Sequence, residues 1–594
     1  MNLSIMESLP PAVSTRSPSA DRLADALFGD GFAHIHAPWR DLVTSPLFRP
    51  RQGLTPHERV DLSYERLRLI ETRIDSALDL AASPDRLAAL HEWITVADGG
   101  ITILAGIHYN LFLGSLADHG HPARTAFEGM PAVGTFLCTE LAHGNDAASV
   151  ETTAVHDPAT GGFVLHTPVP GARKFMPNTG RPGGPKAAVV AARLVADGTD
   201  QGVFLFLVPL TDTRGPLPGV TVEPLDDKAG SPVDHSLTSF RHVPLPADAL
   251  LGGAHGRFED GVFTSGVGNR RRRLLLSIGR VTTGKLCMSA AAVGASRLGL
   301  AVAAAHGRDR TIASPHGKGT IPVMAMRSHH GPLVEAAAEV YAMTLLHRDA
   351  VARTVRGSGD AARAAAVAKA WNTWRGREIL TECRERCGAR GLFPANRLAE
   401  IRADMEGAIT AEGDNLPVWV KSAAELLLDP GDVPAATAPG GDLRDPAVLV
   451  GLLGGLEWHH LAVARRRLRS APAGDPLARW NGTVPFALRL VEAHARHRAA
   501  RALWSTGGEE PLLLDLLRLF ALRHLERSGA DLCRSGLLSA EGMEQLTDLA
   551  EEAISRLAPR LPEVVAAFSL PARLLSDIPL ADGRPDDGLL RAGR

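Results

Sequence analysis

The hydrophobic period of this chain changes twice, and these two changes constrain its fold more than any other feature. Up to about Gly129 the apolar residues recur at the spacing of amphipathic helices. Near Thr135 the pattern shortens to strand-like runs, and past Gly268 the helical spacing returns and holds to the end. The sequence therefore predicts a mainly α protein with a β insertion.

The predicted strands follow one another without intervening helices. A turn rich in Gly and Pro, Asp157–Gly162, separates the first two. Consecutive strands of this kind favour hairpins, so we expect an antiparallel barrel or sandwich. The predicted strands are Glu151–Val155, Phe163–Thr167, Ala187–Leu194, Val203–Pro209, Val220–Pro224 and Ser236–Val243.

The same changes divide the chain into four predicted domains. A Pro/Gly-rich segment, Pro430–Pro446, separates the middle helices from a last helical block. The predicted domains are an N-terminal α domain (1–134), a β-barrel domain (135–268), a central helix bundle (269–432) and a C-terminal α domain (433–594).

Charge and hydropathy argue against nucleic-acid and membrane partners. The formal net charge is −2, so no strong field for nucleic acid or an anionic membrane is expected. We therefore interpret the run Arg270–Arg273 as a solvated face or a helix-end cluster. The longest apolar stretch, Leu286–Ala305, is Ala-rich and interrupted by Ser296 and Arg297, which favours a buried bundle helix over a membrane span.

The cysteines and the termini indicate a reducing compartment and no metal site. Five cysteines form no secretory framework. Cys383 and Cys387 share a helix face, but no second pair completes a zinc site. The N-terminus shows no signal peptide and the C-terminus no peroxisomal address. With a bias towards Ala, Arg, Gly and Leu, these features predict a bacterial, cytoplasmic protein.

The stretch Thr410–Asn415, reading Thr-Ala-Glu-Gly-Asp-Asn, is the first candidate site. Gly413 is expected to end one helix, and Asp414 or Asn415 to cap the next. Glu412 would then lie on a turn between two rigid elements, where a base can project into a pocket. The alternative is an acid that only favours a helix dipole. Glu400 and Glu406 lie close before it as rival carboxylates.

A second candidate is the segment Leu137–Asp146, which leads into the β region and is dense in small hydrogen-bonding groups. Its hydroxyls and backbone N–H groups suit a planar polar ligand. Lys174–Gly180 follows the first hairpin and is expected to form a second wall. The alternative is an ordinary pair of loops between strands. Rossmann, P-loop and HExxH motifs are absent from the sequence.

Several ordered motifs in this sequence resemble the acyl-CoA oxidases of the acyl-CoA dehydrogenase superfamily. The run "CTELAHGNDAASVETTAVHDPATGGFVLHTPVPGARKFMPNTG" resembles their flavin-binding segment, with its Thr-Glu, Glu-Thr-Thr-Ala and Asp-Pro motifs. The runs "PLFRPRQGLTPHERVDLSYERLRLI" and "RCGARGLFPANRL" resemble further family segments, and "TAEGDN" matches the motif that carries the family's glutamate base. The motifs span roughly residues 40 to 430.

The resemblance implies an FAD site in the first part of the chain. Thr139 would contact the isoalloxazine edge, and Cys138 precedes it in the same cofactor-binding segment. Gly144 and Asn145 match the turn beside it. Asn178 stands where the oxidases have a Gly that contacts the flavin.

The later motifs imply the remaining site residues. Arg310 matches an arginine that approaches the FAD phosphates, and Gly388 belongs to a loop that reaches the FAD of a neighbouring subunit, so a homodimer is expected. Glu412 would be the catalytic base. The implied reaction is α,β-desaturation of an acyl-CoA, with O2 as the final acceptor and H2O2 as a product.

Departures from the family pattern leave alternatives open. Phe175-Met176 replaces a paired Trp, and Ala389–Phe393 replaces Gly-His-Gly-Tyr. One alternative is a dehydrogenase-type enzyme that uses an electron-transfer partner or an acyl carrier protein thioester. The other is a non-catalytic protein that binds acyl thioesters on the same fold.

Overall fold

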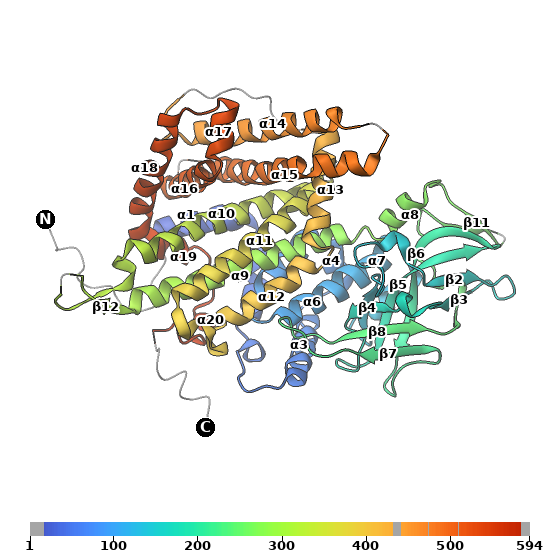
Figure 1. Cartoon of the computed structure of the whole chain (residues 1–594). Helices are drawn as coiled ribbons and strands as arrows, with labels where there is room; N and C mark the ends of the chain where they lie inside the picture. Colours follow the sequence, from blue (N-terminus) through green and yellow to red (C-terminus); the bar gives the residue numbers. More distant parts are fainter. Residues whose placement is uncertain are drawn as a thin grey trace.

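The computed structural model describes residues 17–583, apart from residues 260, 316, 430, 432–440, 473 and 509. Long helices make up most of this part, and one β domain lies at the side of the helical body (Figure 1). The predicted fold class, mainly α with a β insertion, is confirmed. The predictions for residues 1–16 and for the centre of the 430–446 linker lie outside the described residues.

Short helices precede the β domain. One of them begins at a capping box, in which the Thr55 side chain accepts from the N–H of Glu58 and the Glu58 carboxylate accepts from the N–H of Thr55. Pro56 takes the first helical position, where its missing N–H leaves no helical bond unmade. The helices are α1 (Pro18–Phe28), α2 (Ala37–Leu42), α3 (Pro56–Glu71), α4 (Ala77–Ala82), α5 (Pro84–Ile94), α6 (Gly99–Ala105) and α7 (Gly114–Asp118).

The β domain contains a larger mixed sheet and a smaller antiparallel one. β5 (Lys186–Ala196) is antiparallel to β6 (Thr199–Thr211) but parallel to both β1 (Val133–Leu137) and β2 (Thr153–His156). β3 (Phe163–His166) joins β2 to β9 (Val243–Leu245). β4 (Lys174–Pro177), β8 (His235–Phe240) and β7 (Val220–Pro224) form the smaller sheet.

The parallel pairs are the main difference from the expected antiparallel domain. β5 lies between β1 and β2, so these consecutive strands are not spatial neighbours. Parallel neighbours need long connections rather than tight hairpins, and the segments after β1 and after β3 are long enough to supply them. Two hairpins also lie outside the expected strands: β10 (Arg257–Glu259) with β11 (Val262–Thr264), and β12 (Thr311–Ala313) with β13 (Thr320–Pro322).

A bundle of long helices follows the β domain, and its centre is α9. Leu286–Ala305, expected to be a buried helix, lies within it. α9 packs against α5, α10 and α11, so helices from both sides of the β insertion share one core. The bundle helices are α8 (Arg270–Ser277), α9 (Val281–Asp309), α10 (Arg327–Val355), α11 (Ala361–Arg386), α12 (Leu398–Thr410) and α13 (Asn415–Leu428).

The helices between Pro446 and Leu557 form a layer over α10 and α11, seen at the top of Figure 1 in orange and red, whereas the next helix, Leu561–Ala566, packs against α1, α9 and α10. Arg523 on α16 ties this layer to the bundle through Glu335 of α10, at 2.9 Å. The helices are α14 (Pro446–Ser470), α15 (Pro476–Gly507), α16 (Pro511–Arg527), α17 (Gly529–Ser535), α18 (Ala540–Leu557), α19 (Leu561–Ala566) and α20 (Ala572–Ser576).

Three helical stretches are long and apolar enough to cross a membrane, judged by length and composition: Gly99–Asp118, Val281–Asp309 and Pro446–Ser470. In this fold, 89%, 100% and 56% of their most apolar windows are buried against the rest of the protein. The apolar character of the first two therefore matches positions inside the core.

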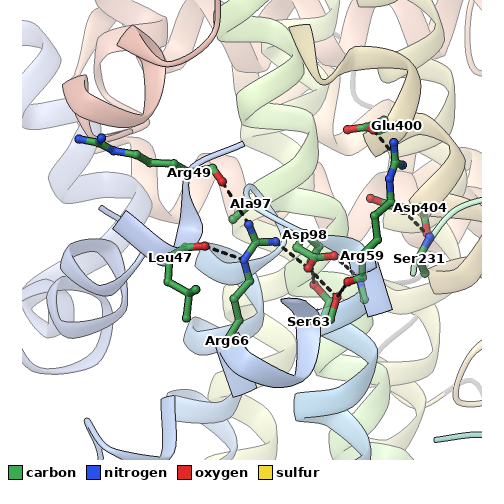
Figure 2. Close-up of polar contacts among 12 residues, drawn as sticks. Leu47, Arg49, Arg59, Ser63, Arg66, Ala97, Asp98, Ser231, Glu400 and Asp404 are labelled. Carbon is green, nitrogen blue, oxygen red and sulfur yellow. Dashed lines mark hydrogen bonds and ion pairs between the residues drawn. The ribbon is translucent and has the colours of Figure 1, made fainter. Parts of the chain in front are cut away.

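A buried polar network joins α3 to the start of α6 (Figure 2). Arg66 donates to Asp98 at 2.7 Å and to the backbone oxygen of Leu47 at 3.0 Å, and Ser63 donates to the same carboxylate at 2.7 Å. Asp98 also caps α6 through the N–H of Gly100. Its charge is thus compensated by several donors, as a buried carboxylate requires.

The same region fixes α12, the helix that leads to the Thr410–Asn415 turn (Figure 2). Arg59 of α3 donates to Glu400 at 3.2 Å, and the N–H of Ser231 donates to Asp404 at 2.5 Å. α12 is therefore held by the N-terminal helices on one side and by a β-domain loop on the other. These contacts fix the first half of α12 against both neighbours.

Candidate active site

The turn between α12 and α13 has an unusual backbone at Glu412. Its φ is +61°, and that of Gly413 is +93°. A left-handed conformation costs a non-glycine residue about 1 kcal/mol or more, and such residues cluster at functional sites. The sequence predicted the break at Gly413, but not the strained glutamate before it.

The expected helix cap is replaced by other contacts. Asp414 occupies the N-cap position of α13, but its side chain makes no capping hydrogen bond. Asn415 is buried and donates instead to the Thr373 hydroxyl, at 2.8 Å, and to the Ala370 oxygen, at 3.2 Å. The end of the turn is thereby attached to α11.

The Glu412 carboxyl group is half-buried, and its Oε2 atom is buried without a hydrogen-bond partner among the described residues. Burial raises the pKa of Glu412 to about 7, although Lys285 and Lys369 act in the opposite direction. A carboxylate with a pKa near neutrality is suited to general-base catalysis, because it is ionised at working pH and still accepts protons well.

Gly284 on α9 makes room for this carboxyl group. A Cβ atom on Gly284 would lie 2.1 Å from Cδ of Glu412 and 2.3 and 2.5 Å from its two oxygens. Any side chain at position 284 would therefore displace the Glu412 carboxyl group from this position. The direct contact places Glu412 beside the first turn of α9.

Two lysines lie around Glu412. Lys369, fully buried on α11, donates to the backbone oxygens of Ile409 at 2.7 Å and of Gly413 at 2.8 Å. Lys285 follows Gly284 on α9 and donates to the oxygen of Val281 at 3.2 Å. Burial lowers the pKa of Lys369 to about 7 and that of Lys285 to about 8.

The loop that follows β1 reaches the same turn. Asn145, which also has a positive φ of +60°, donates from Nδ2 to the Asp414 carboxylate at 2.5 Å. Its Oδ1 accepts from the N–H of Asp414 at 3.3 Å. Gly144 lies next to it in the exposed part of the loop. The structure therefore brings two of the sequence motifs, Gly144-Asn145 and the Glu412 turn, into contact.

The start of the loop after β1 is held in place by residues of β4. Cys138 and Thr139 follow β1 and are both half-buried. The Thr139 oxygen accepts from the N–H of Phe175 at 3.0 Å. A buried ion pair lies below them, in which Lys174 donates to Glu140 at 2.9 Å and to the Cys138 oxygen at 3.3 Å. The two expected walls, 137–146 and 174–180, are therefore adjacent.

Asn178 is fully buried, and its side chain bonds within the protein. It has a φ of +68°, donates to the oxygen of Gly134 at 2.9 Å and lies 2.7 Å from the Tyr64 hydroxyl through Oδ1. The Tyr64 hydroxyl is also 2.7 Å from Asp234. Asn178 thus joins β1 to α3 through its side chain.

Arg310 and Gly388 lie elsewhere. Gly284, in contact with Glu412, and Asp309, the last residue of α9, are 25 positions apart, which corresponds to about 38 Å of helix. Arg310 follows immediately and is exposed. Burial raises the pKa of the Cys387 thiol to about 12, and Arg310 is close enough to act in the opposite direction, so Gly388, the next residue, lies in the same region. Within one chain, these residues are remote from Glu412.

A concentration of positive charge surrounds Arg310. Burial and the charges of Arg310 and Arg390 lower the pKa of His306, and burial with Arg386 and Arg310 lowers that of His329 to about 4. Cations that depress the pKa values of their neighbours create a site that favours an anion.

Four residues of this site were not singled out in the sequence: Tyr64, Gly284, Lys285 and Lys369. A signal for Lys369 was present, because it is a lone charge within the helical run Ala364–Trp371. Lys285 is likewise the first charge of an otherwise apolar helix start. Gly284 and Tyr64 carried no comparable signal, because their roles depend on contacts with distant segments.

The organisation into helices, β domain, helix bundle and further helices defines a fold class shared with solved acyl-CoA oxidases. The chain superposes on acyl-CoA oxidase-2 of Caenorhabditis elegans, a structure bound with FAD, ascaroside-CoA and ATP. The TM-score is 0.84 at 19% identity, and the match covers 98% of this chain and 95% of the other. At this identity the likeness concerns the fold.

Sequence comparisons point to the same group of proteins. The family model "Acyl-CoA oxidase, C-alpha1 domain" matches residues 281–427, which include Gly284, Lys369 and Glu412. Acyl-coenzyme A oxidase 2 of Arabidopsis thaliana is 28% identical over 370 residues, which cover 59% of this chain and 53% of that protein. Peroxisomal acyl-coenzyme A oxidase 3 of Homo sapiens is 28% identical over 414 residues, which cover 65% and 59%. In sequence and in fold, the chain is therefore similar to acyl-CoA oxidases.

These comparisons also correct one expectation and set one limit. The names of both relatives place them in peroxisomes of a plant and a mammal, which contradicts the expected bacterial, cytoplasmic location. The matched region spans little more than half the length of each relative.

Proposed function

We propose that this protein is an FAD-dependent oxidase that converts an acyl-CoA to the trans-2-enoyl thioester, with O2 as the electron acceptor and H2O2 as a product. The observation that carries the proposal is Glu412, a strained, half-buried carboxylate with an unpartnered oxygen and a pKa raised to about 7. The similarity to acyl-CoA oxidases supports the reaction class.

The two rival carboxylates have ordinary environments. Glu400 pairs with Arg59 at 3.2 Å and with Arg397 at 3.3 Å. Glu406 is exposed and pairs with Arg377 at 3.4 Å. Ion pairs with arginines near the surface are common and contribute little energy. Of the three, Glu412 is the one with a buried oxygen that has no hydrogen-bond partner among the described residues.

Two groups of residues suit FAD. Thr139 and Cys138, with the neighbouring Asn145 loop, lie on the side of the Glu412 turn and offer small polar groups for a planar ring. The cationic region around Arg310, which includes Gly388, offers positive charge for a diphosphate. The solved relative from Caenorhabditis elegans binds FAD.

We infer that the complete site needs two subunits. The ring-side residues lie near Glu412 and the cationic residues about 38 Å away at the other end of α9, so one chain cannot present both to one cofactor. In a homodimer, Arg310 and Gly388 of one subunit can serve the site of the other.

In the proposed mechanism, Glu412 removes a proton from the carbon next to the thioester carbonyl. Because the carboxylate rests against Gly284, its direction is fixed before the substrate arrives. Removal of solvent from its Oε2 raises its proton affinity, which favours the transfer. When bound, FAD supplies the two-electron oxidation and the reaction with O2.

The proposal is tested with Glu412→Gln and, as the matched control, Glu406→Gln. Purified protein is mixed anaerobically with acyl-CoAs of several chain lengths while the flavin absorbance is followed. We expect bleaching with at least one thioester, its loss in Glu412→Gln and its retention in Glu406→Gln. Rapid bleaching in Glu412→Gln would refute the assignment, and protein that binds no FAD would refute the function.

The pH dependence offers an independent check. The base acts when it is ionised, so the rate of flavin bleaching should rise with pH around a midpoint near 7. A midpoint near the ordinary glutamate value of 4.5 would contradict the environment described for Glu412. An oxygen electrode that records the consumption of O2, together with detection of peroxide, then establishes O2 as the acceptor.

A further inference from the structure

Lys369 has a contact pattern that the proposed reaction does not use. We propose that Lys369 is a positioning residue that ties the two ends of the Glu412 turn together and, with Lys285, favours the ionised form of the base. This inference rests on the proposed function, because it assigns a role towards Glu412.

The two hydrogen bonds of Lys369 enclose the turn. Ile409 lies before Glu412, in the last turn of α12, and Gly413 lies directly after it. The same ammonium group holds both carbonyl oxygens, at 2.7 and 2.8 Å. The intervening chain must therefore reverse within a few residues, which is the setting in which Glu412 has its positive φ.

A buried lysine needs hydrogen-bond acceptors, and the two carbonyl oxygens compensate the charge of Lys369 only in part. Carbonyl oxygens satisfy two of the three ammonium donors but carry no full charge. Lys369 is fully buried on α11, and the charges that act favourably on it are those of Glu412 and Asp414. The Lys369 ammonium group and the Glu412 carboxylate thus act as counter-ions of each other.

Lys285 completes the arrangement from the opposite helix. It follows Gly284, the residue in contact with the Glu412 carboxyl group, and Glu412 is the charge that acts favourably on it. The groups that face Glu412 are therefore Lys285 and Cys287 on α9 and Lys369 on α11, and the charge of Asp414 acts on Lys369.

A purely structural lysine and a charge-bearing positioning residue predict different results. If Lys369 only supports the backbone, its loss lowers the rate of flavin bleaching equally at every pH. If its charge also favours the Glu412 carboxylate, its loss raises the pKa of the base. The pH at which bleaching reaches half its maximum rate then moves upwards, by about one pH unit or more for a cation this close.

The experiment compares Lys369→Met, Lys369→Arg and Lys421→Met with the unmodified full-length protein. Lys421 is a matched control, because it is an exposed lysine of α13 that pairs with Glu425 and acts on Lys285 only at a distance. Anaerobic stopped-flow bleaching by a saturating acyl-CoA is measured from pH 5.5 to 9.5, with thermal unfolding and flavin content recorded for each variant.

We expect Lys369→Met to move the midpoint upwards, Lys369→Arg to restore it at least in part, and Lys421→Met to leave it unchanged. A midpoint that stays in place in flavin-loaded Lys369→Met would overturn the proposal. If Lys369→Met fails to fold, Lys285→Met is measured in its place. A midpoint that stays in place in Lys285→Met would also overturn the proposal. If the unmodified protein shows no bleaching with any acyl-CoA, the proposed function itself has failed.

Discussion

Substitution of Gly284 by alanine tests the position of the base most directly. The new Cβ atom would lie 2.1 Å from Cδ of Glu412, whereas real Cβ contacts are essentially never shorter than 3.0 Å. α9 is packed in the core on several sides, so the carboxyl group must move by about 1 Å. A displacement of this size in a catalytic group costs about 100-fold in rate.

The measured quantity is the rate constant for flavin bleaching after anaerobic mixing with an acyl-CoA. We expect about a 100-fold fall in Gly284→Ala, with flavin content retained. The thermal midpoint should not fall greatly, because alanine in a helix is favoured over glycine by about 1 kcal/mol, which offsets part of the crowding. This separates a displaced base from a protein that has simply lost its fold.

Gly482→Ala serves as the control, because Gly482 is also helical, on α15, and a Cβ there meets open space. Its rate constant should equal that of the unmodified protein. If Gly284→Ala also bleaches within about threefold of the unmodified rate, then the Glu412 carboxyl group either does not lie against α9 or is not the base.

Three further changes probe the surroundings of the site. Asn145→Gly keeps a residue that tolerates positive φ but removes the amide that donates to Asp414 in the Glu412 turn. We expect about fivefold to tenfold slower flavin bleaching and little change in the thermal midpoint. Tyr64→Phe removes the hydroxyl that lies between the buried Asn178 and the half-buried Asp234 and should destabilise the protein by about 1–3 kcal/mol in denaturant unfolding, with Tyr64→His as a less conservative comparison. Burial raises the pKa of Asp404 to about 6 from 3.8, so its stabilising contribution is present below pH 4 and is lost as the pH rises through 6. Asp404→Asn should therefore gain stability relative to the unmodified protein between pH 4 and pH 8, by up to about 3 kcal/mol; a gain that does not grow with pH would contradict this.

The sequence was sufficient for the architecture because hydrophobic period is a local property. The switch near Thr135 and the return past Gly268 are visible in short windows, and both agree with the elements of the structure. Strand partners are not local. Nothing in the residues of β1 and β2 shows that β5, whose residues come later in the chain, lies between them, so the parallel pairs could not be predicted.

The candidate site likewise has features that are local in the sequence and features that depend on contacts between distant segments. Gly413 and Glu412 form a recognisable local motif, but the positive φ of Glu412 depends on how α11 and α12 meet, which no local pattern contains. The room left by Gly284 is a contact between segments more than a hundred residues apart. The separation of Arg310 from Glu412 depends on the same contact, because the length of α9 gives a distance from Glu412 only once Gly284 is known to touch it.

The strain at Glu412 and its chemistry depend on the same contacts. A left-handed glutamate is disfavoured by about 1 kcal/mol or more, so something must hold the turn in this shape. The available contacts are the two bonds from Lys369, the clasp between Asn145 and Asp414, and the attachment of Asn415 to α11. They come from two segments, α11 and the loop after β1, and together they leave the Glu412 carboxyl group one direction to point, towards Gly284. A relaxed turn would remove the strain and, with it, the fixed direction of the base.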